Sequence, residues 1–132
     1  MKHVPNILGA LLGLLFVVGG ASFLLDMLPE QEPPPEGSTM ALFMGAFVPS
    51  GYMTFVKVCE LVGGLALMIP KTRGLGVLIL GPVVVNIFAF HVFVGEGAML
   101  TDPTLLAVGA LTLAVIAFEA PRLVRFAFKT GG

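Results

Sequence analysis

Two apolar segments that carry polar residues inside them decide the fold of this chain. The first contains KVCELVGG (residues 57–64) and the second contains PVVVNIFAFH (residues 82–91). As helices, the full segments, residues 51–69 and 75–94, are long enough to cross a bilayer, which takes about 20 apolar residues. A charged side chain at the bilayer centre costs about 2.5–3.5 kcal/mol on insertion scales. We therefore expect Glu60 and Asn86 to be paired, hydrated or used in function.

The composition around these segments is that of a membrane protein. Of the 132 residues, 57% are hydrophobic and 11% are charged, whereas soluble domains carry roughly 25% charged residues. The length suits one domain, residues 1–132, with no separate soluble part. No cluster of lysine and arginine suits nucleic acid. The single cysteine, Cys59, excludes an intramolecular disulfide, a CxxC pair and a zinc or iron–sulfur cage built from this chain alone.

Four membrane spans are predicted, and they cover residues 4–28, 51–69, 75–94 and 104–120. The first span has a competing interpretation as a signal peptide, because Lys2 precedes it and small residues follow at 20–22. Its apolar run of about 25 residues exceeds the 7–15 of a signal-peptide core, which favours a retained helix. Residues 40–48 are too few to span a bilayer and predict a half-helix or an interfacial segment. The last span is expected to start at an N-cap, Asp102, followed by Pro103.

The charges fall on opposite sides of this four-span arrangement. The basic side carries Lys2, Lys71, Arg73, Arg122, Arg125 and Lys129, and the acidic side carries Asp26, Glu30, Glu32, Glu36, Glu96 and Asp102. Only Lys57 and Glu60 are expected inside the membrane, with Glu119 near the basic end. By the positive-inside rule, both termini lie in the cytoplasm. Residues 121–132 predict a basic amphipathic tail along the membrane surface. The expected fold is an all-α, integral membrane four-helix bundle.

Helical geometry predicts which intramembrane polar residues meet. At a rise of about 1.5 Å per residue, Glu60 and Asn86 lie at one depth, and Lys57 and His91 share a shallower one. Lys57 and Glu60 are three residues apart and fall on one face of their helix. A contact between Glu60 and Asn86 is therefore expected across the helical hairpin. His91 lies about 140° further round its helix and is expected to point to another helix or to an aspartate near the outer rim.

Two interpretations of this polar set remain open. In the structural one, Lys57 and Glu60 neutralise each other and Asn86 satisfies the remaining hydrogen bonds, which locks the helices together. In the functional one, Glu60 and Lys57 are candidate catalytic residues, and Asn86, His91 and Tyr52 are candidate ligand-binding residues, because intramembrane ionisable groups usually mark functional sites. No metal site is expected, since no second histidine lies close in sequence to His91.

Three motifs together resemble a known family: PSGY (residues 49–52), Lys57-x-x-Glu60-x-x-Gly63-Gly64, and Pro82-x-x-x-Asn86-x-x-x-Phe90-His91-x-Phe93. Their order is similar to that in the DoxX family of small four-helix membrane proteins. The resemblance implies a bacterial cytoplasmic (inner) membrane protein whose functional polar set is Lys57, Glu60, Asn86 and His91. Some relatives are subunits of a thiosulfate:quinone oxidoreductase, and others associate with thiol or oxidative-stress proteins. A direct thiol–disulfide role does not fit this chain, which has one cysteine.

The leading functional prediction is a membrane subunit of a redox-associated complex. Glu60 and Asn86 would serve a quinone headgroup or a proton path, because quinone carbonyls need hydrogen-bond donors and their reduction needs a proton donor nearby. The expected partners are membrane lipid and either membrane or redox proteins or further copies of the chain. One alternative is a non-catalytic scaffold or assembly subunit whose glycine faces recruit partner helices. The other is a small-solute transporter that acts as an oligomer.

Overall fold

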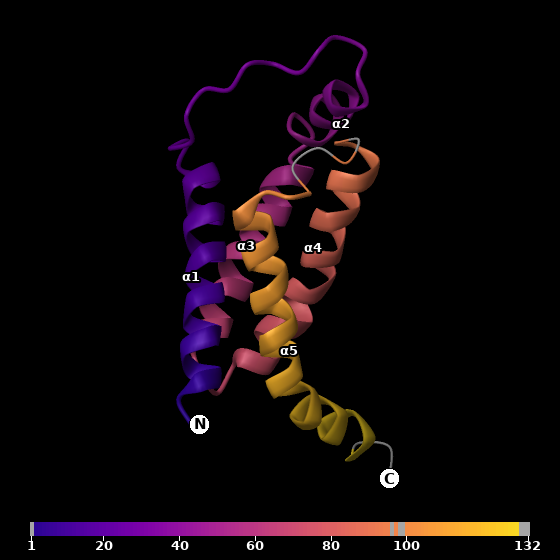
Figure 1. Cartoon of the computed structure of the whole chain (residues 1–132). Coiled ribbons are helices and arrows are strands. Elements are labelled where there is room, and N and C mark those ends of the chain that lie inside the picture. Colours follow the sequence, from indigo (N-terminus) through magenta and orange to yellow (C-terminus); the bar gives the residue numbers. More distant parts are fainter. Residues whose placement is uncertain (1, 96, 98–99, 130–132) are drawn as a thin grey trace.

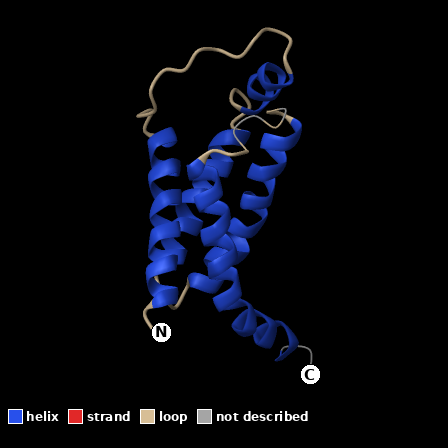
Figure 2. Ribbon diagram, in the orientation of Figure 1, coloured by secondary structure: helices blue, strands red, loops and turns tan. Residues whose placement is uncertain are grey.

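Five helices make up the part of the chain that the computed structural model describes, residues 2–95, 97 and 100–129. They are α1 (Val4–Leu24), α2 (Thr39–Phe47), α3 (Tyr52–Met68), α4 (Arg73–Phe93) and α5 (Pro103–Lys129). Within these residues the ribbon contains no strand (Figure 2), so the predicted all-α class is confirmed. The four long helices run alongside one another, and the short α2 lies at one end (Figure 1).

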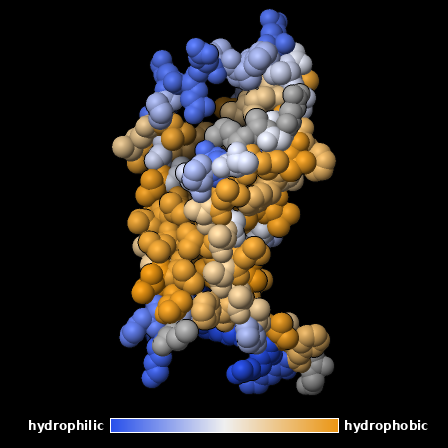
Figure 3. Space-filling view, viewed as in Figure 1, coloured by the Kyte–Doolittle hydropathy of each residue, from blue (hydrophilic) through white to orange (hydrophobic). Residues whose placement is uncertain are grey.

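The lengths and composition of the helices are those of a multi-pass membrane protein. With 21, 21 and 27 residues, α1, α4 and α5 are each long and apolar enough to cross a membrane. The shorter α2 and α3 pass the same test only together, as one span bent by 78° or as a re-entrant segment. The described residues thus provide three candidate spans, or four if α2 and α3 form one. Hydrophobic side chains cover the middle of the molecule, and hydrophilic ones gather at both ends (Figure 3).

The helix ends differ most from the predicted spans at two places. α1 ends at Leu24 rather than at residue 28, and Asp26 adopts a left-handed φ of 54° soon after it. α5 does not stop at residue 120 but continues through Pro121 to Lys129, so the described part of the predicted tail belongs to α5. A proline inside a helix removes one backbone hydrogen bond and permits a bend. The end of α5 turns away from the other helices (Figure 1).

Glycines allow α1 and α3 to pack at backbone distance. A Cβ added to Gly13 would collide with the backbone oxygen of Gly64, and one added to Gly64 would lie 2.7 Å from the backbone oxygen of Gly13. A Cβ on Gly9 would lie 2.8 Å from the backbone oxygen of Leu67. Small residues are typical of such close helix contacts in membranes. The small residues of the Gly9-x-x-x-Gly13 segment therefore serve a close helix contact inside the molecule.

The long helices surround one apolar core. α1 packs against α3 and α5, and α4 packs against the same two helices. Side chains from all four build the core: Leu12, Phe16, Leu67, Leu80, Val84 and Val115. The start of α1, the turn between α3 and α4, and the end of α5 lie at one end of the molecule (Figure 1). The basic residues therefore gather at that end and the described acidic loop residues at the other, while Glu96 lies outside the described residues.

Candidate functional site

The ion pair between Lys57 and Glu60 on α3 is the centre of the candidate site. The Nζ atom of Lys57 lies 3.1 Å from Oε2 and 3.3 Å from Oε1 of Glu60. The Glu60 side chain is 6% exposed and that of Lys57 is 24% exposed. The ammonium group also lies 5.8 Å from the ring centroid of Phe23 on α1. The predicted pairing is confirmed, and it neutralises a carboxylate that would otherwise be buried without a counter-ion.

Two cavities, of about 290 and 270 Å³, share four lining residues, Lys57, Glu60, Ile87 and His91. The first lies among α1, α3, α4 and the start of α5, and the second among α2, α3 and α4. Both combine apolar walls with a few convergent polar groups, which is the usual make-up of a small-molecule site. Their volumes lie just below the range for such sites, about 300–1,000 Å³. The buried ion pair is thus accessible to a small ligand from either cavity.

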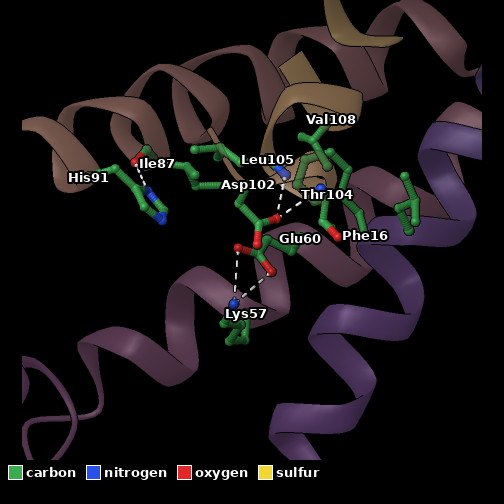
Figure 4. Close-up of a pocket in the computed structure, with 10 residues that line it drawn as sticks. Phe16, Lys57, Glu60, Ile87, His91, Asp102, Thr104, Leu105 and Val108 are labelled. Carbon is green, nitrogen blue, oxygen red and sulfur yellow. Dashed lines mark hydrogen bonds and ion pairs between the residues drawn. The ribbon is translucent and has the colours of Figure 1, made fainter. Parts of the chain in front are cut away.

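Asp102 enters the first cavity from the N-terminus of α5. Its Oδ1 accepts hydrogen bonds from the backbone N–H groups of Thr104 at 2.8 Å and Leu105 at 3.2 Å, so the predicted N-cap is confirmed. In Figure 4 the Asp102 carboxylate points toward Glu60. The first cavity therefore has two carboxylates, one ammonium and one imidazole on its wall. The sequence placed Asp102 at the outer rim, but only the packing of α5 brings it into the site.

His91 lines both cavities from the last turn of α4. Its Nδ1 lies 2.7 Å from the backbone oxygen of Ile87. Because a carbonyl oxygen can only accept, Nδ1 carries the hydrogen, and Nε2 is left for a ligand. His91 lines the first cavity together with Asp102, an aspartate near the predicted rim. It also lines the second cavity together with Asn86, which the angle between the two residues on their helix did not predict. The described residues contain no group of three or more His, Cys, Asp or Glu side chains suited to a metal ion.

Asn86 does not form the predicted direct contact with Glu60. It is exposed on α4 and makes no side-chain hydrogen bond within the described part of the chain. Both residues line the second cavity, so the depth argument placed them in the same neighbourhood correctly. The two side chains thus share a cavity wall, but no hydrogen bond joins them. The amide of Asn86 is consequently free to bind a ligand in the second cavity.

Aromatic side chains form the wall of the second cavity on the side of α2. The ring centroid of Phe43 on α2 lies 4.8 Å from that of Phe90 on α4. The ring of Phe47 lies 4.7 Å from that of Tyr52, which begins α3 and is 49% exposed. Phe43 and Tyr52 both line the cavity. The short helix expected at residues 40–48 is therefore present as α2, and it contributes Phe43, a cavity residue that the sequence did not single out.

A second buried ion pair lies at the opposite end of the molecule from this site. Arg73 and Glu119 have side chains that are 5% and 7% exposed, with Nη1 of the arginine 3.4 Å from Oε1 of the glutamate. Nη2 of Arg73 also donates to Oδ1 of Asn6 on α1 at 2.8 Å. The sequence placed Glu119 near the basic end but did not predict that it is buried against Arg73. The sequence placed Arg73 in a turn, whereas it begins α4 and turns its side chain inward.

Comparisons with models of known protein families, with curated proteins and with solved structures found no match. The resemblance to DoxX proteins and the ligand roles of the site residues accordingly stay predictions. The geometry of the two cavities and the charges between them are the features that point to a function.

Replacing Lys57 with methionine tests the ion pair of the site. The variant leaves the buried Glu60 carboxylate without a counter-ion, so its free energy of unfolding in detergent should fall by about 1–3 kcal/mol. Lys71→Met changes an exposed lysine and is the matched control, with an expected effect within about 0.5 kcal/mol. Equal stability of Lys57→Met and the wild type would contradict a stabilising role for the pair.

Proposed function

We propose that this chain is a DoxX-like membrane subunit of a redox-associated complex and that it holds a quinone headgroup beside the ion pair. The observation that carries the proposal is the composition of the second cavity. Its walls are largely apolar, and two donors, Asn86 and Lys57, converge there with the Glu60 carboxylate and the His91 imidazole. A quinone headgroup is a flat apolar ring with carbonyl acceptors on its edge. Donors set in apolar walls are the groups that would bind it.

The proposed setting is a four-helix bundle in a bacterial inner membrane, in which α2 and α3 together make the bent span. The length and hydropathy of the helices and the apolar middle of the molecule support it (Figure 3). Both termini would be cytoplasmic, because the basic residues gather at the end where α1 begins and α5 ends. The two cavities then lie in the outer half of the membrane.

The second cavity fits a headgroup better than a whole lipid-sized molecule. Its volume of about 270 Å³ is small, and the rings of Phe43 and Phe90 lie on its wall. Aromatic rings favour offset or edge-on contact with a second flat ring, at about 0.5–1.5 kcal/mol beyond area burial. The unpaired amide of Asn86 would donate to one carbonyl of the ring. The apolar tail would lie along the lipid-facing side chains of α3 and α4.

The first cavity supports a proton path that begins at the same residues. Reduction of a quinone takes up two electrons and two protons, and the electrons would have to come from a partner redox protein. Glu60 and His91 belong to both cavities, so they are placed to exchange protons with a ligand oxygen. Asp102 shares the first cavity with them and would continue the path toward the outer surface.

The packing of the glycines limits the scaffold alternative. That alternative needs glycine faces that are open to partner helices. Gly9, Gly13 and Gly64 are occupied by contacts between α1, α3 and α4. Gly19 on α1 and Gly81 on α4 have no neighbouring atom within 4 Å of an added Cβ, so a partner helix would have to approach there or at the apolar side chains that face lipid.

Glu60→Gln is expected to lose bound quinone. The amide cannot hold the Lys57 ammonium as a carboxylate does, so the ion pair at the cavity wall is lost. The amount of quinone that co-purifies with the protein should therefore fall about tenfold or more. The measurement is gentle solubilisation from native membranes, followed by mass spectrometry of co-purified proteins and extracted quinones. Asp26→Asn is the matched control, since it makes the same carboxyl-to-amide change at an exposed residue of the same end.

Two results of this experiment would reject the proposed site. Quinone retained equally by the wild type and Glu60→Gln would place the ligand elsewhere. The same partner proteins in both samples with no quinone in either would make the chain a scaffold and the buried charges a structural lock.

A further inference from the structure

The end of α5 extends beyond the other helices (Figure 1). After Pro121 the helix continues to Lys129. Large apolar side chains are exposed there, with Val124 at 54% and Phe128 at 80%. Leu123 faces inward, because a Cβ added to Gly74 on α4 would lie 3.2 Å from its Cδ2. This segment therefore has one side against the molecule and the rest of its surface open.

Basic side chains form a stripe on the open surface. Arg122, Arg125 and Lys129 are three and four residues apart, so at 3.6 residues per turn they lie within about 60° of one another. Arg122 fixes the stripe against the turn between α3 and α4, since its Nη1 and Nη2 donate to the backbone oxygens of Pro70 at 3.3 Å and Lys71 at 3.4 Å. Arg125, Lys129 and Lys71 are exposed. Neither Arg125 nor Lys129 forms an ion pair within the described part of the chain.

An apolar stripe runs beside the basic one. Val124 and Phe128 are four residues apart and lie on a line about 110° round the helix from the centre of the basic stripe. A helix that is only hydrated has no need of large apolar side chains next to its charges. Adjoining basic and apolar stripes are typical of helices that lie in the membrane interface, with the apolar side in the acyl-chain boundary and the basic side among the headgroups.

The position of the segment determines the kind of surface that it meets. It lies at the end of the molecule where Lys2 and Lys71 also lie, which is the cytoplasmic end in the proposed arrangement. The cytoplasmic leaflet carries the anionic lipids that attract basic segments beside a membrane span. Positive side chains thus face a negative surface.

We infer that the end of α5 is a binding site for anionic phospholipid headgroups, formed by Arg125 and Lys129 with Lys71 beside them. Val124 and Phe128 enter the boundary of the acyl chains under the same headgroups. The inference rests on the proposed membrane arrangement but not on the quinone site, which lies at the other end of the molecule. The protein then binds anionic lipids of the bilayer in preference to uncharged ones.

Titration of the full-length protein in detergent with short-chain phosphatidylglycerol, followed by native mass spectrometry, tests the site. The wild type should bind phosphatidylglycerol more tightly than phosphatidylcholine. Each basic residue near the surface contributes about fivefold in affinity. Arg125→Gln should therefore weaken phosphatidylglycerol binding about fivefold, and Arg125→Gln with Lys129→Gln about 25-fold, whereas binding of phosphatidylcholine stays the same.

Lys2→Gln is the matched control, because it removes one positive charge from the same end but outside the stripe, and it should change the affinity by less than about twofold. Undiminished phosphatidylglycerol binding by the double variant would overturn the inference. Equal affinity of the wild type for the two lipids would do the same. If inorganic phosphate displaced phosphatidylglycerol at equal concentration, the site would be one for free anions. If the double variant lost only a co-purifying acidic protein, it would be a protein interface.

Discussion

Replacing Glu119 with alanine is expected to lower the free energy of unfolding by about 3–5 kcal/mol, the usual loss when one partner of a buried ion pair is removed. The pair is well buried, with residue exposures of 4% for Arg73 and 5% for Glu119. Without the carboxylate, the guanidinium retains, among the described residues, its hydrogen bond to Asn6 at 2.8 Å. Arg122 adds little to the pair, since it is 3.8 Å from Glu119 Oε2 and its side chain is 60% exposed. Unfolding in mixed micelles measures the effect.

The double variant Arg73→Met with Glu119→Leu separates ion pairing from general damage. Removing both charges at once leaves no unpaired buried charge, so the double variant should regain much of the stability that Glu119→Ala loses. Glu36→Ala, at an exposed glutamate of the loop between α1 and α2, is the control and should be neutral within about 0.5 kcal/mol. A double variant no more stable than Glu119→Ala would contradict the explanation by an unpaired buried charge.

Gly13→Ala is expected to destabilise the protein by about 1–3 kcal/mol although alanine is the better helix former. The added Cβ collides with the backbone oxygen of Gly64, and it would lie 2.6 Å from Cγ of Met68. The side chain of Met68 can move, but the backbone of α3 cannot do so without separating α1 from α3. Gly13→Leu should have a larger effect for the same reason.

Gly19→Ala is the matched control on the same helix, because a Cβ at Gly19 has no other atom within 4 Å. It should leave stability unchanged or raise it by up to about 1 kcal/mol, which is the difference in helix propensity between the two residues. The two variants are therefore expected to act in opposite directions. Equal effects of Gly13→Ala and Gly19→Ala in the same unfolding assay would show that α1 and α3 do not pack as described.

The parts of the candidate site that follow from local geometry were predictable. Lys57 and Glu60 are three residues apart in one helix, so their pairing needs no knowledge of the fold. The same holds for the capping of α5 by Asp102, since the cap and its donors are neighbours in the chain. The depth of Asn86 also followed from the rise of a helix, which is why it lines a cavity with Glu60.

The parts that depend on how helices face one another were not predictable. Asn86 lies at the right depth and lines a cavity with Glu60, but no hydrogen bond joins the two side chains, and a small difference in rotation about the helix axis is enough to separate them. Arg73 and Glu119 are 46 residues apart, and each looked like an ordinary charge near a helix end. Phe43 reaches the site because α2 lies against the start of α3 and the end of α4.

The sequence by itself determined that this chain is helical, where its long apolar helices lie, and that its charges gather at opposite ends. These properties depend on composition and on contacts within a few residues, which each segment carries with it. The tertiary structure alone decided that Gly13 meets Gly64, that Arg73 is buried against Glu119, and that Asp102 and Phe43 reach the cavities around Glu60. Those contacts depend on the rotation and spacing of whole helices, which are set by the packing of many side chains at once.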